Sequence, residues 1–500
     1  MNRLTWILCL SLIAHLAGAQ EKERAYNVLL ILVDDLRPAL GSFGDVHAIS
    51  PHIDALSKQA TVFERAYSNQ AVCVASRYNL LLGSRSTSTG LYDFGRAFRD
   101  AYPNATTLPQ LFKNNGYYTA AIGKVFHVGH NTYNDDESWS VPHWHDKVVE
   151  YADPNHHQET REEALFANKT WAYANRLKKG SAWERLDVAD DAYADGRVAR
   201  QAVQRLQELQ GQDTPFFLAV GFARPHLPFT VPAKYWDLYN PDALPIPAQQ
   251  TNPKNAPDIA VKRDGEISQY AEIPLAKASD PFPDSLTRQL IHGYYAGISY
   301  VDTQIGKVLQ ELKDSGLDEQ TIVVLWGDHG YLLGEMGMWT KHVNYELANR
   351  IPVIIKHPEI KEGHHSMDLL ETVDLYPTLA ELAALPLDTS AQPIDGLSFA
   401  SYLTKPESPV RTSVYHCFPR GGKLGRAIRT EDFRLVAWQD IEGRQEVEYE
   451  LYEYKDGLIE TENIWSPSHP AFLTLKAILD KQPDPAPLRP ESKKRKENKL

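Results

Sequence analysis

The stretch YNVLLILVDD (residues 26–35) decides the fold class, because an unbroken apolar run ends there in two acids. Continuous runs rich in Val, Ile and Leu are typical of strands that are buried on both faces. Three further stretches have the same form: YYTAAIGKVFH (117–127), PFFLAVGFARPH (215–226) and TIVVLWGDHG (321–330). We therefore predict four buried strands, each followed by polar residues.

Amphipathic segments lie between these strands. SPHIDALSKQATVFERAY (50–67) spaces its apolar residues as one face of a helix, and its Ser-Pro start favours helix initiation. ADGRVARQAVQRLQELQ (194–210) and YAGISYVDTQIGKVLQELKDSG (295–316) predict two more helices. Strands that alternate with helices indicate an α/β fold with a large, mostly parallel central sheet between helices.

The rest of the chain predicts two domains and a tail. Residues 20–405 form the predicted large N-terminal domain, with polar loop excursions over 130–195 and 230–290. Short strands and turns over 406–490 predict a smaller C-terminal subdomain with an antiparallel sheet, and the basic residues 491–500 predict a disordered tail. The net charge of -13 argues against nucleic-acid binding.

Residues 1–19 resemble a targeting segment. Arg3, an apolar run and Ala17-Gly18-Ala19 predict a secretory signal peptide, and hence a periplasmic or secreted protein. A membrane anchor is the alternative, but the run is too short to span a bilayer comfortably. No other segment is apolar enough to predict a membrane span.

Removal of the signal peptide leaves Cys73 and Cys417. In an exported protein they could form a disulfide. Cys73, in AVCVASRYNLLLGSR (71–85), could also be a buried small hydrophobe, a nucleophile or the precursor of a modified residue.

The acids at the strand ends predict a metal site. Asp34 and Asp35 end one predicted strand, and Asp328 and His329 end another. In open α/β sheets, ligands bind outside the carboxyl ends of the strands. Carboxylate oxygens suit a hard divalent cation, either Ca²⁺ or Mg²⁺.

A second group of strand-end residues predicts an anion site. Lys124, His127, His226 and Lys341 follow or lie near the same predicted strand ends. Several cations around one crevice would bind an anion such as sulfate or phosphate.

These motifs, in this order, resemble the type I sulfatases of the alkaline phosphatase superfamily. The signature Cys-x-(Pro/Ala)-x-Arg occurs as Cys73-Val74-Ala75-Ser76-Arg77, followed by LLLGSR. NVLLILVDDLRPALGSFGD, GKVFHVGH, ARPHLPF and GDHGYLLGEMGMWTKH are most similar to the iduronate-2-sulfatase subgroup. The resemblance covers nearly the whole mature chain. It implies an alkaline-phosphatase-like sandwich with a smaller α/β subdomain, and it makes residues 20–405 the catalytic domain.

The resemblance implies that a separate maturation enzyme converts Cys73 to Cα-formylglycine. The hydrated aldehyde attacks sulfur, and its second hydroxyl then expels sulfate. One Ca²⁺ would be bound by the converted Cys73 together with Asp34, Asp35, Asp328 and His329.

The remaining catalytic roles are also implied by the resemblance. Arg77 would orient the hydrated aldehyde, and Lys124 and Lys341 would bind sulfate oxygens. His127 would act as the base in the breakdown of the intermediate, and His226 would protonate the leaving oxygen.

The implied substrate is a sulfated oligosaccharide that carries the 2-O-sulfate of a uronate. Glycosaminoglycans and algal polysaccharides both remain open. Tyr331, at a position where the subgroup has tryptophan, is expected to give an aromatic wall for a sugar ring, and Ala75, in place of the usual proline, fits radical-type maturation enzymes. Candidate cations for the uronate carboxylate are Arg96, Arg99, Arg224 and Lys423.

Two alternatives to a sulfatase remain. A phosphodiesterase or phosphonate hydrolase of the same superfamily would share most of these residues. A glycan-binding protein that is not matured would keep an intact thiol at Cys73 and release no sulfate.

Overall fold

The computed structural model describes residues 25–492, apart from 263–264, 275–280, 361, 405–408, 442–445 and 456. The predicted signal peptide lies outside these residues, as do residues 493–500 of the predicted tail. The strands are β1 (Asn27–Val33), β2 (Thr61–Tyr67), β3 (Tyr118–Gly123), β4 (Trp183–Leu186), β5 (Phe216–Phe222), β6 (Phe229–Pro232), β7 (Thr321–Gly327), β8 (Arg350–Lys356), β9 (His364–Glu371), β10 (Val414–Arg420), β11 (Lys423–Arg429), β12 (Phe433–Asp440) and β13 (Glu446–Glu453). The α-helices are α2 (Pro51–Ser57), α3 (Cys73–Leu82), α4 (Ser86–Thr89), α5 (Phe98–Ala101), α6 (Leu108–Asn114), α7 (Arg161–Phe166), α8 (Trp171–Ala174), α9 (Ala194–Leu209), α10 (Ala233–Trp236), α11 (Asp284–Asp314), α12 (Glu346–Asn349), α13 (Leu375–Leu382), α14 (Ala400–Thr404) and α15 (Pro470–Leu479).

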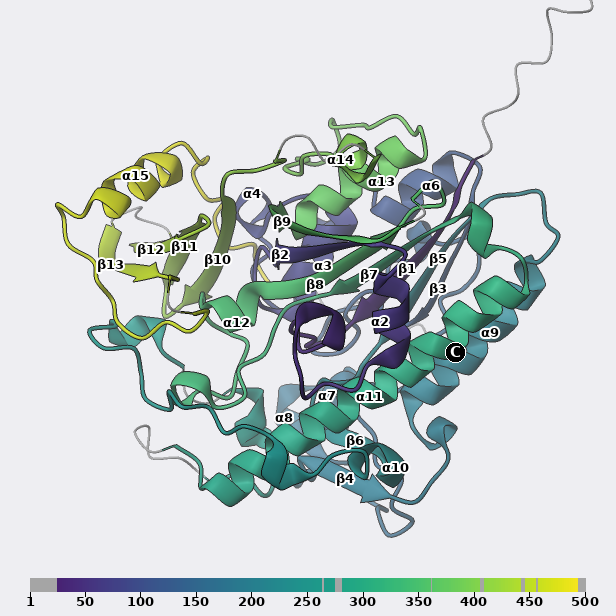
Figure 1. Ribbon diagram of the computed structural model, residues 1–500, viewed down its shortest axis with the longest axis horizontal. Coiled ribbons are helices and arrows are strands. Elements are labelled where there is room, and N and C mark those ends of the chain that lie inside the picture. The colour runs from purple at the N-terminus through teal and green to yellow at the C-terminus, as the bar shows by residue number, and fades with distance from the viewer. Residues whose placement is uncertain are drawn as a thin grey trace, which may run out of the picture.

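The central sheet has seven strands in the order β3-β5-β1-β7-β8-β2-β9 (Figure 1). Parallel pairing joins β3 to β5, β5 to β1 and β1 to β7, so the four predicted strands are neighbours. β8 runs antiparallel to both β7 and β2, which makes the sheet mixed. The predicted α/β fold is confirmed, and the carboxyl ends of β3, β5, β1 and β7 meet at one edge.

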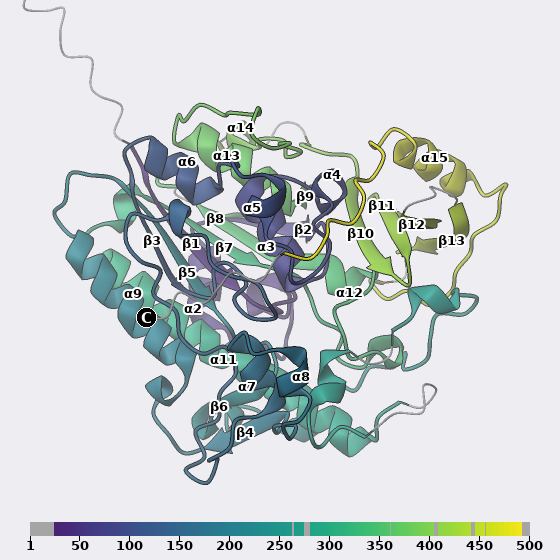
Figure 2. The same ribbon diagram turned by 180° about the vertical axis from the view of Figure 1, so that it is seen from behind.

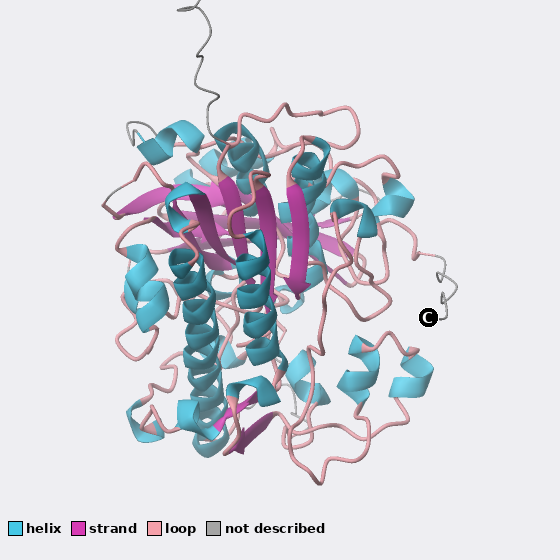
Figure 3. Ribbon diagram, turned by 90° about the vertical axis from the view of Figure 1, so that its right-hand side faces the viewer, coloured by secondary structure: helices cyan, strands magenta, loops and turns pink. Residues whose placement is uncertain are grey.

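Helices cover both faces of this sheet, because successive side chains of a strand point to opposite sides. Leu29, Ile31 and Val33 of β1 pack in the core that includes α2, α9 and α11. The alternate residues of β1 pack in a second core with α3, α6 and α13, which lie on the side seen in Figure 2. Figure 3 shows helices beside the central strands and the small β4-β6 sheet beyond one end of them.

The predicted helix over residues 50–67 is wrong in its second half. α2 begins at Pro51 as expected but ends at Ser57, and the chain then forms β2. β2 is paired on both sides, antiparallel with β8 and parallel with β9. The residues Thr61-Val62-Phe63 are β-branched or aromatic and favour a strand, although their spacing also fits a helix. Pairing within the sheet, which satisfies the backbone polar groups, decides between the two.

The other two predicted helices are present. α9 confirms the helix predicted over 194–210, and α11 contains the one predicted over 295–316 but begins earlier, at Asp284. Its first part contains Gly293, which a helix pattern does not favour. A Cβ atom at this position would lie 2.7 Å from the ring of Phe229, so close packing accounts for the glycine. Among the described residues, no helix combines the length and the hydropathy that a membrane span requires.

The second sheet lies near the C-terminal end of the chain. β10, β11, β12 and β13 form four antiparallel strands, and α15 packs on them through Phe472 and Leu475. This confirms the predicted small antiparallel sheet with a helix. The predicted boundary near residue 405 falls beside residues outside the described part of the chain, and it stays a prediction.

A buried group of charges joins the two sheets. Glu346 of α12 lies 2.9 Å from the Nε atom of Arg429 and 2.7 Å from the Nη2 atom of Arg434. These arginines belong to β11 and β12, and Arg434 also pairs with Glu460 at 2.6 Å. Burial alone would raise the pKa of Glu346, but the two arginines outweigh this effect and lower the pKa to about 2. The group therefore connects the small sheet to the segment that follows β7.

We predict that Glu346→Gln lowers the free energy of unfolding by about 3–5 kcal/mol at neutral pH, because it removes the carboxylate that neutralises two buried arginines. Glu431→Gln, which breaks the exposed ion pair with Arg65, should cost less than about 1 kcal/mol. Urea denaturation measures both effects.

The pH dependence of this effect follows from the pKa of Glu346. In the unfolded chain its pKa is about 4.3, whereas in the folded chain it is about 2. The stability from the ionised group is thus fully present above the unfolded value and is lost as the pH falls toward 2. The difference between the wild type and Glu346→Gln should shrink over the same range, and a constant difference would contradict the assignment.

Candidate active site at the carboxyl edge of the central sheet

Two adjacent acids follow β1, and the backbone turns so that both face the same site. Asp35 has a φ of 58°, in the left-handed region that residues other than glycine rarely adopt. Its N–H donates to the Oδ1 atom of Asp328, at 3.0 Å, beyond the end of β7. The N–H of Asp328 in turn donates to Val33, the last residue of β1. The predicted convergence of these acids is present.

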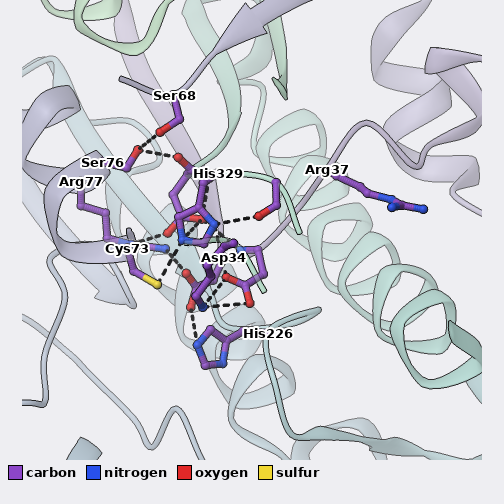
Figure 4. Close-up of polar contacts among 12 residues, drawn as sticks. Asp34, Arg37, Ser68, Cys73, Ser76, Arg77, His226 and His329 are labelled. Atoms are coloured by element: carbon purple, nitrogen blue, oxygen red, sulfur yellow. Dashed lines mark hydrogen bonds and ion pairs between the residues drawn. The ribbon is translucent and has the colours of Figure 1, made fainter. Parts of the chain in front are cut away.

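Cys73 is the first residue of α3. Its Sγ atom lies 3.2 Å from the Nε2 atom of His329 (Figure 4). The hydroxyl of Ser76 donates to the carbonyl of Asp328 at 2.5 Å and fixes the start of the helix against the end of β7. Cys73 and Cys417 are both free thiols, so the alternative of a disulfide is wrong.

Arg77, one turn further along α3, lies between the acids. Its Nε atom is 3.1 Å from Asp328, and its Nη2 atom is 3.4 Å from Asp34. Its Nη1 atom donates to the carbonyl of Val125 at 3.0 Å and to that of Lys124. All of these side chains are buried, and Figure 4 shows the guanidinium directed into the cluster, whereas Arg37 points away and pairs with Glu335 at 2.7 Å.

The carboxylates are held in different electrostatic states. Burial alone would raise the pKa of Asp34, but Lys124, His226 and Arg77 lower it well below the usual value. Burial and the nearby charge of Asp34 raise the pKa of Asp328 well above its usual value. The carboxyl groups of Asp34 and Asp328 therefore lie so close together that the charge of one disfavours the ionisation of the other.

Two lysines from different parts of the chain pair with the acids. The Nζ atom of Lys124, just beyond β3, pairs with Asp34. The Nζ atom of Lys341 lies 2.8 Å and 3.0 Å from the two carboxylate oxygens of Asp35. Lys341 comes from the loop between β7 and α12, so the structure brings together residues that are far apart in the sequence.

His226 follows β5 and faces the same acids. Its Nδ1 atom donates to the carbonyl of Leu227 at 2.5 Å, because that acceptor requires a protonated nitrogen. Its Nε2 atom lies 4.0 Å from Asp34 and 3.2 Å from Glu266. The same oxygen of Glu266 lies 3.2 Å from Lys341, so one carboxylate bridges His226 and Lys341.

His127 lies on the remaining side of the site. The ring is buried, its Nε2 atom is 3.4 Å from the Nδ1 atom of His130, and its Nδ1 atom has no hydrogen-bond partner among the described residues. Burial, followed by the charge of Lys124, lowers the pKa of His127 well below 6.5. Its imidazole is therefore neutral at neutral pH.

These side chains surround a cavity of about 410 Å³. The predicted residues that line it are Cys73, His127, His226 and Lys341. A larger cavity of about 750 Å³ includes Lys124 and Phe166 but none of the other predicted catalytic residues. The smaller cavity is the one that joins the thiol to the cations.

Several residues of the site were not predicted. Glu266 lies in an irregular segment over 230–290, where no periodicity or motif marks it. His130 lies in the quoted motif GKVFHVGH, which was the available signal. Asp195 of α9 is buried and accepts from the N–H groups of Ala223 and Arg224, at 2.8 Å and 2.7 Å, so it fixes the loop that carries His226.

The expected aromatic wall at Tyr331 is wrong. Its side chain is buried, with its ring 6.3 Å from that of Tyr294 in the core, and it does not line the cavity.

The four candidate cations for a uronate carboxylate are also wrong, because none lines the cavity among the described residues. Arg224 is buried and donates to the carbonyl of His226, and Arg99 pairs with Asp135 at 2.8 Å. Arg96 donates to a carbonyl of Arg489 at 2.6 Å. Lys423 lies 3.3 Å from Glu448 on the small sheet. The cations of the cavity that were not predicted are Arg161 and Lys262.

Comparisons with known proteins agree with this geometry. Residues 26–385 match the family model Sulfatase, and residues 334–482 match the model N-sulphoglucosamine sulphohydrolase, C-terminal. The chain is 33% identical to iduronate 2-sulfatase of Mus musculus over 83% of this chain and 85% of that protein. It is 35% identical to iduronate 2-sulfatase of Homo sapiens over 76% of this chain and 74% of that protein.

A solved structure of a protein in complex with its substrate D-glucosamine-2-N,6-O-disulfate superimposes with a TM-score of 0.70. The two sequences are 21% identical, and the superposition covers 91% of this chain and 97% of the other. At this level of identity the likeness shows a shared fold.

We predict that Asp195→Asn lowers the free energy of unfolding by about 1–3 kcal/mol, because the amide group cannot accept from both backbone N–H groups as the carboxylate does. Chemical denaturation measures this loss. Asp191→Asn is the control, since Asp191 lies in the same region but pairs with Arg200 at an exposed position. An equal, small change in both variants would show that Asp195 does not fix the loop.

Proposed function

The chain belongs to the sulfatase family, and we propose that this sulfuric ester hydrolase is exported and removes the 2-O-sulfate of a uronate in a sulfated glycan. The observation that carries the proposal is the position of Cys73, at a helix start beside a cluster of paired acids and cations. The names of the two iduronate 2-sulfatases support the substrate class. The sequence of residues 1–19 supports export.

The environment of Cys73 argues against an ordinary thiolate nucleophile. Burial and the charge of Asp34 raise the pKa of the thiol well above its usual value. Conversion to formylglycine by a maturation enzyme resolves this difficulty, because the modified residue supplies a hydrated aldehyde as the nucleophile. The Cys73 sulfur marks the position that the reactive oxygen would take.

The acids around residue 73 fit a Ca²⁺ ion. Ligand atoms of Asp34, Cys73, Asp328 and His329 all lie within 4.8 Å of one another, and a second such group includes Asp35. Oxygen donors suit a hard divalent cation, and such a cation would offset the repulsion between the buried carboxylates. When bound, it would polarise a sulfate oxygen.

The cations beside these acids fit a sulfate ester. Lys124 and Lys341 have their ammonium groups at the site and would bind sulfate oxygens, where negative charge increases in the transition state. Arg77 would hold residue 73 in position through the acids that it contacts.

The two histidines fit opposite proton transfers. His127 is neutral because burial lowers its pKa, and it would accept a proton as the base. The Nδ1 atom of His226 donates its proton to the carbonyl of Leu227. A proton on the Nε2 atom, which faces Glu266, is therefore the one that would pass to the leaving sugar oxygen.

We predict that the matured protein releases sulfate from a 2-O-sulfated uronate disaccharide faster than it releases phosphate from a phosphate ester. His226→Ala should lower kcat on the disaccharide by about 10²-fold or more, and by less on an aryl sulfate, whose leaving group needs no proton. Ion chromatography of released sulfate measures both rates.

His365→Ala is the matched control, because this histidine is half-exposed and pairs with Glu64. Equal losses on the two substrates would remove His226 as the acid. A wild-type protein that is fully matured but hydrolyses neither substrate would contradict the proposed function itself.

We predict that Ca²⁺ raises the Tm of the wild type and raises that of Asp35→Asn much less. Asparagine tolerates the left-handed backbone conformation at this position, so the substitution removes charge and leaves the turn intact. A ligand that binds the folded state alone stabilises it as its concentration exceeds Kd. Differential scanning calorimetry with and without Ca²⁺ measures the shift, and identical shifts in the two proteins would place the ion elsewhere.

A further inference from the structure

A second cavity adjoins the one that contains Cys73 and plays no part in the chemistry described above. Its volume is about 410 Å³, and the two cavities share Phe94, Lys262 and His342. Phe418 and Arg420, at the end of β10, complete its lining on the side of the small sheet. The cavity therefore lies where the C-terminal sheet meets the active site.

Arg420 is a half-buried cation without an acidic partner. Its Nη1 atom donates to the carbonyl of Ile259 at 2.6 Å, its Nη2 atom donates to the carbonyl of His342, and its guanidinium lies 5.3 Å from the ring of Phe418. No acid in the described part of the chain forms an ion pair with it, and burial lowers its pKa to about 10. The guanidinium has five N–H donors, and an anion in the cavity could accept from those that the two carbonyls leave free.

His342 presents an unpartnered donor in the same region. Its Nδ1 atom lies 3.2 Å from the Nζ atom of Lys262 and accepts from this ammonium group. Because burial and Lys262 keep the pKa of this histidine well below 6.5, the ring is neutral and carries its proton on Nε2. The Nε2 atom is buried and has no hydrogen-bond partner among the described residues.

The acid that lines this cavity does not neutralise it. Asp93 is the acidic residue among the described lining residues. Its side chain is 59% exposed and lies 3.9 Å from Arg96, at the rim. Among the described residues, the interior of the cavity thus has the guanidinium of Arg420 and the orphan N–H donor of His342, and both can bind an anion.

We propose that this cavity is a second anion-binding subsite, in which Arg420 and His342 bind an acidic group on the sugar next to the one whose sulfate ester is cleaved. Phe94, whose ring lies 5.0 Å from that of His127, forms the wall that both sugars would contact. The acidic group is a carboxylate or a sulfate. The substrate is then an oligosaccharide with acidic groups on neighbouring sugars, which deepens the proposed function and rests on it.

Binding to a catalytically inactive protein tests this subsite independently of turnover. The full chain with Cys73→Ala is titrated calorimetrically with three disaccharides that carry the same sulfated uronate. Their second sugar bears a sulfate, a carboxylate or no acidic group. We expect the first or the second to bind more tightly than the third, and Arg420→Gln to weaken that binding by about 10- to 100-fold. The disaccharide whose affinity falls more in Arg420→Gln carries the acidic group that the subsite binds.

Two further variants separate binding from folding. Arg420→Lys keeps the charge and should restore part of the affinity. Lys423→Gln removes one positive charge from β11, outside the cavity, and should leave the affinity unchanged. Equal weakening of all three disaccharides by Arg420→Gln, or no weakening, would overturn the subsite.

The failure of the subsite and the failure of the proposed function can be told apart. If the matured wild type releases no sulfate but the acidic disaccharide still depends on Arg420 for binding, the subsite stands and the catalytic proposal fails. If sulfate is released and binding does not depend on Arg420, the catalytic proposal stands and the subsite fails.

Discussion

A single buried guanidinium, that of Arg77, holds the active site together. It contacts the acids that follow β1 and β7 and the carbonyls that follow β3. These contacts connect α3 to the carboxyl edge of the sheet and fix the first residue of that helix, Cys73, beside His329. They also compensate in part for carboxylates that are buried together. Breaking such a pair would leave uncompensated charge in the interior, so the geometry of the reactive residue and the stability of the sheet edge depend on one group.

The same edge holds the groups for two kinds of chemistry. Acids that suit a metal ion and lysines that suit a sulfate lie beside residue 73 and pair with one another. Glu266 bridges His226 and Lys341, and so orients these two side chains with one oxygen. The small C-terminal sheet adds a further cation, Arg420, at the neighbouring cavity. The proposed catalytic residues thus lie at the central sheet, whereas the proposed recognition of a longer substrate would involve both sheets.

Much of this arrangement could be predicted from the sequence, for a physical reason. Parallel strands place their carboxyl ends at one edge, so the polar residues that end β1, β3, β5 and β7 had to meet. Lys341 was grouped with these residues because it lies near a predicted strand end. Cys73 follows no such rule, and only the resemblance to a family chose among its possible roles. The assignment of residues 61–67 to a helix failed because apolar spacing fits both a helix and a strand buried in a sheet.

Residues that act through tertiary contacts could not be predicted. Glu266 begins the short 3-10 helix Glu266–Gln269, which no sequence motif marks, and Arg420 comes from a different sheet. Arg224 resembles a substrate-binding cation in the sequence, but it is buried and lines neither of the two cavities at the site. Only the fold shows which cations line a cavity and which do not.

The most direct test of the central claim is the mass of the tryptic peptide over residues 66–77, from protein purified from its native source. The peptide should have the mass expected for an aldehyde or its hydrate at residue 73, and the preparation should release sulfate from a sulfated uronate. An unmodified cysteine at that position, in a preparation that nevertheless hydrolyses the substrate, would contradict the assigned chemistry. An unmodified cysteine without hydrolysis would instead favour a protein that binds sulfated glycans and does not cleave them.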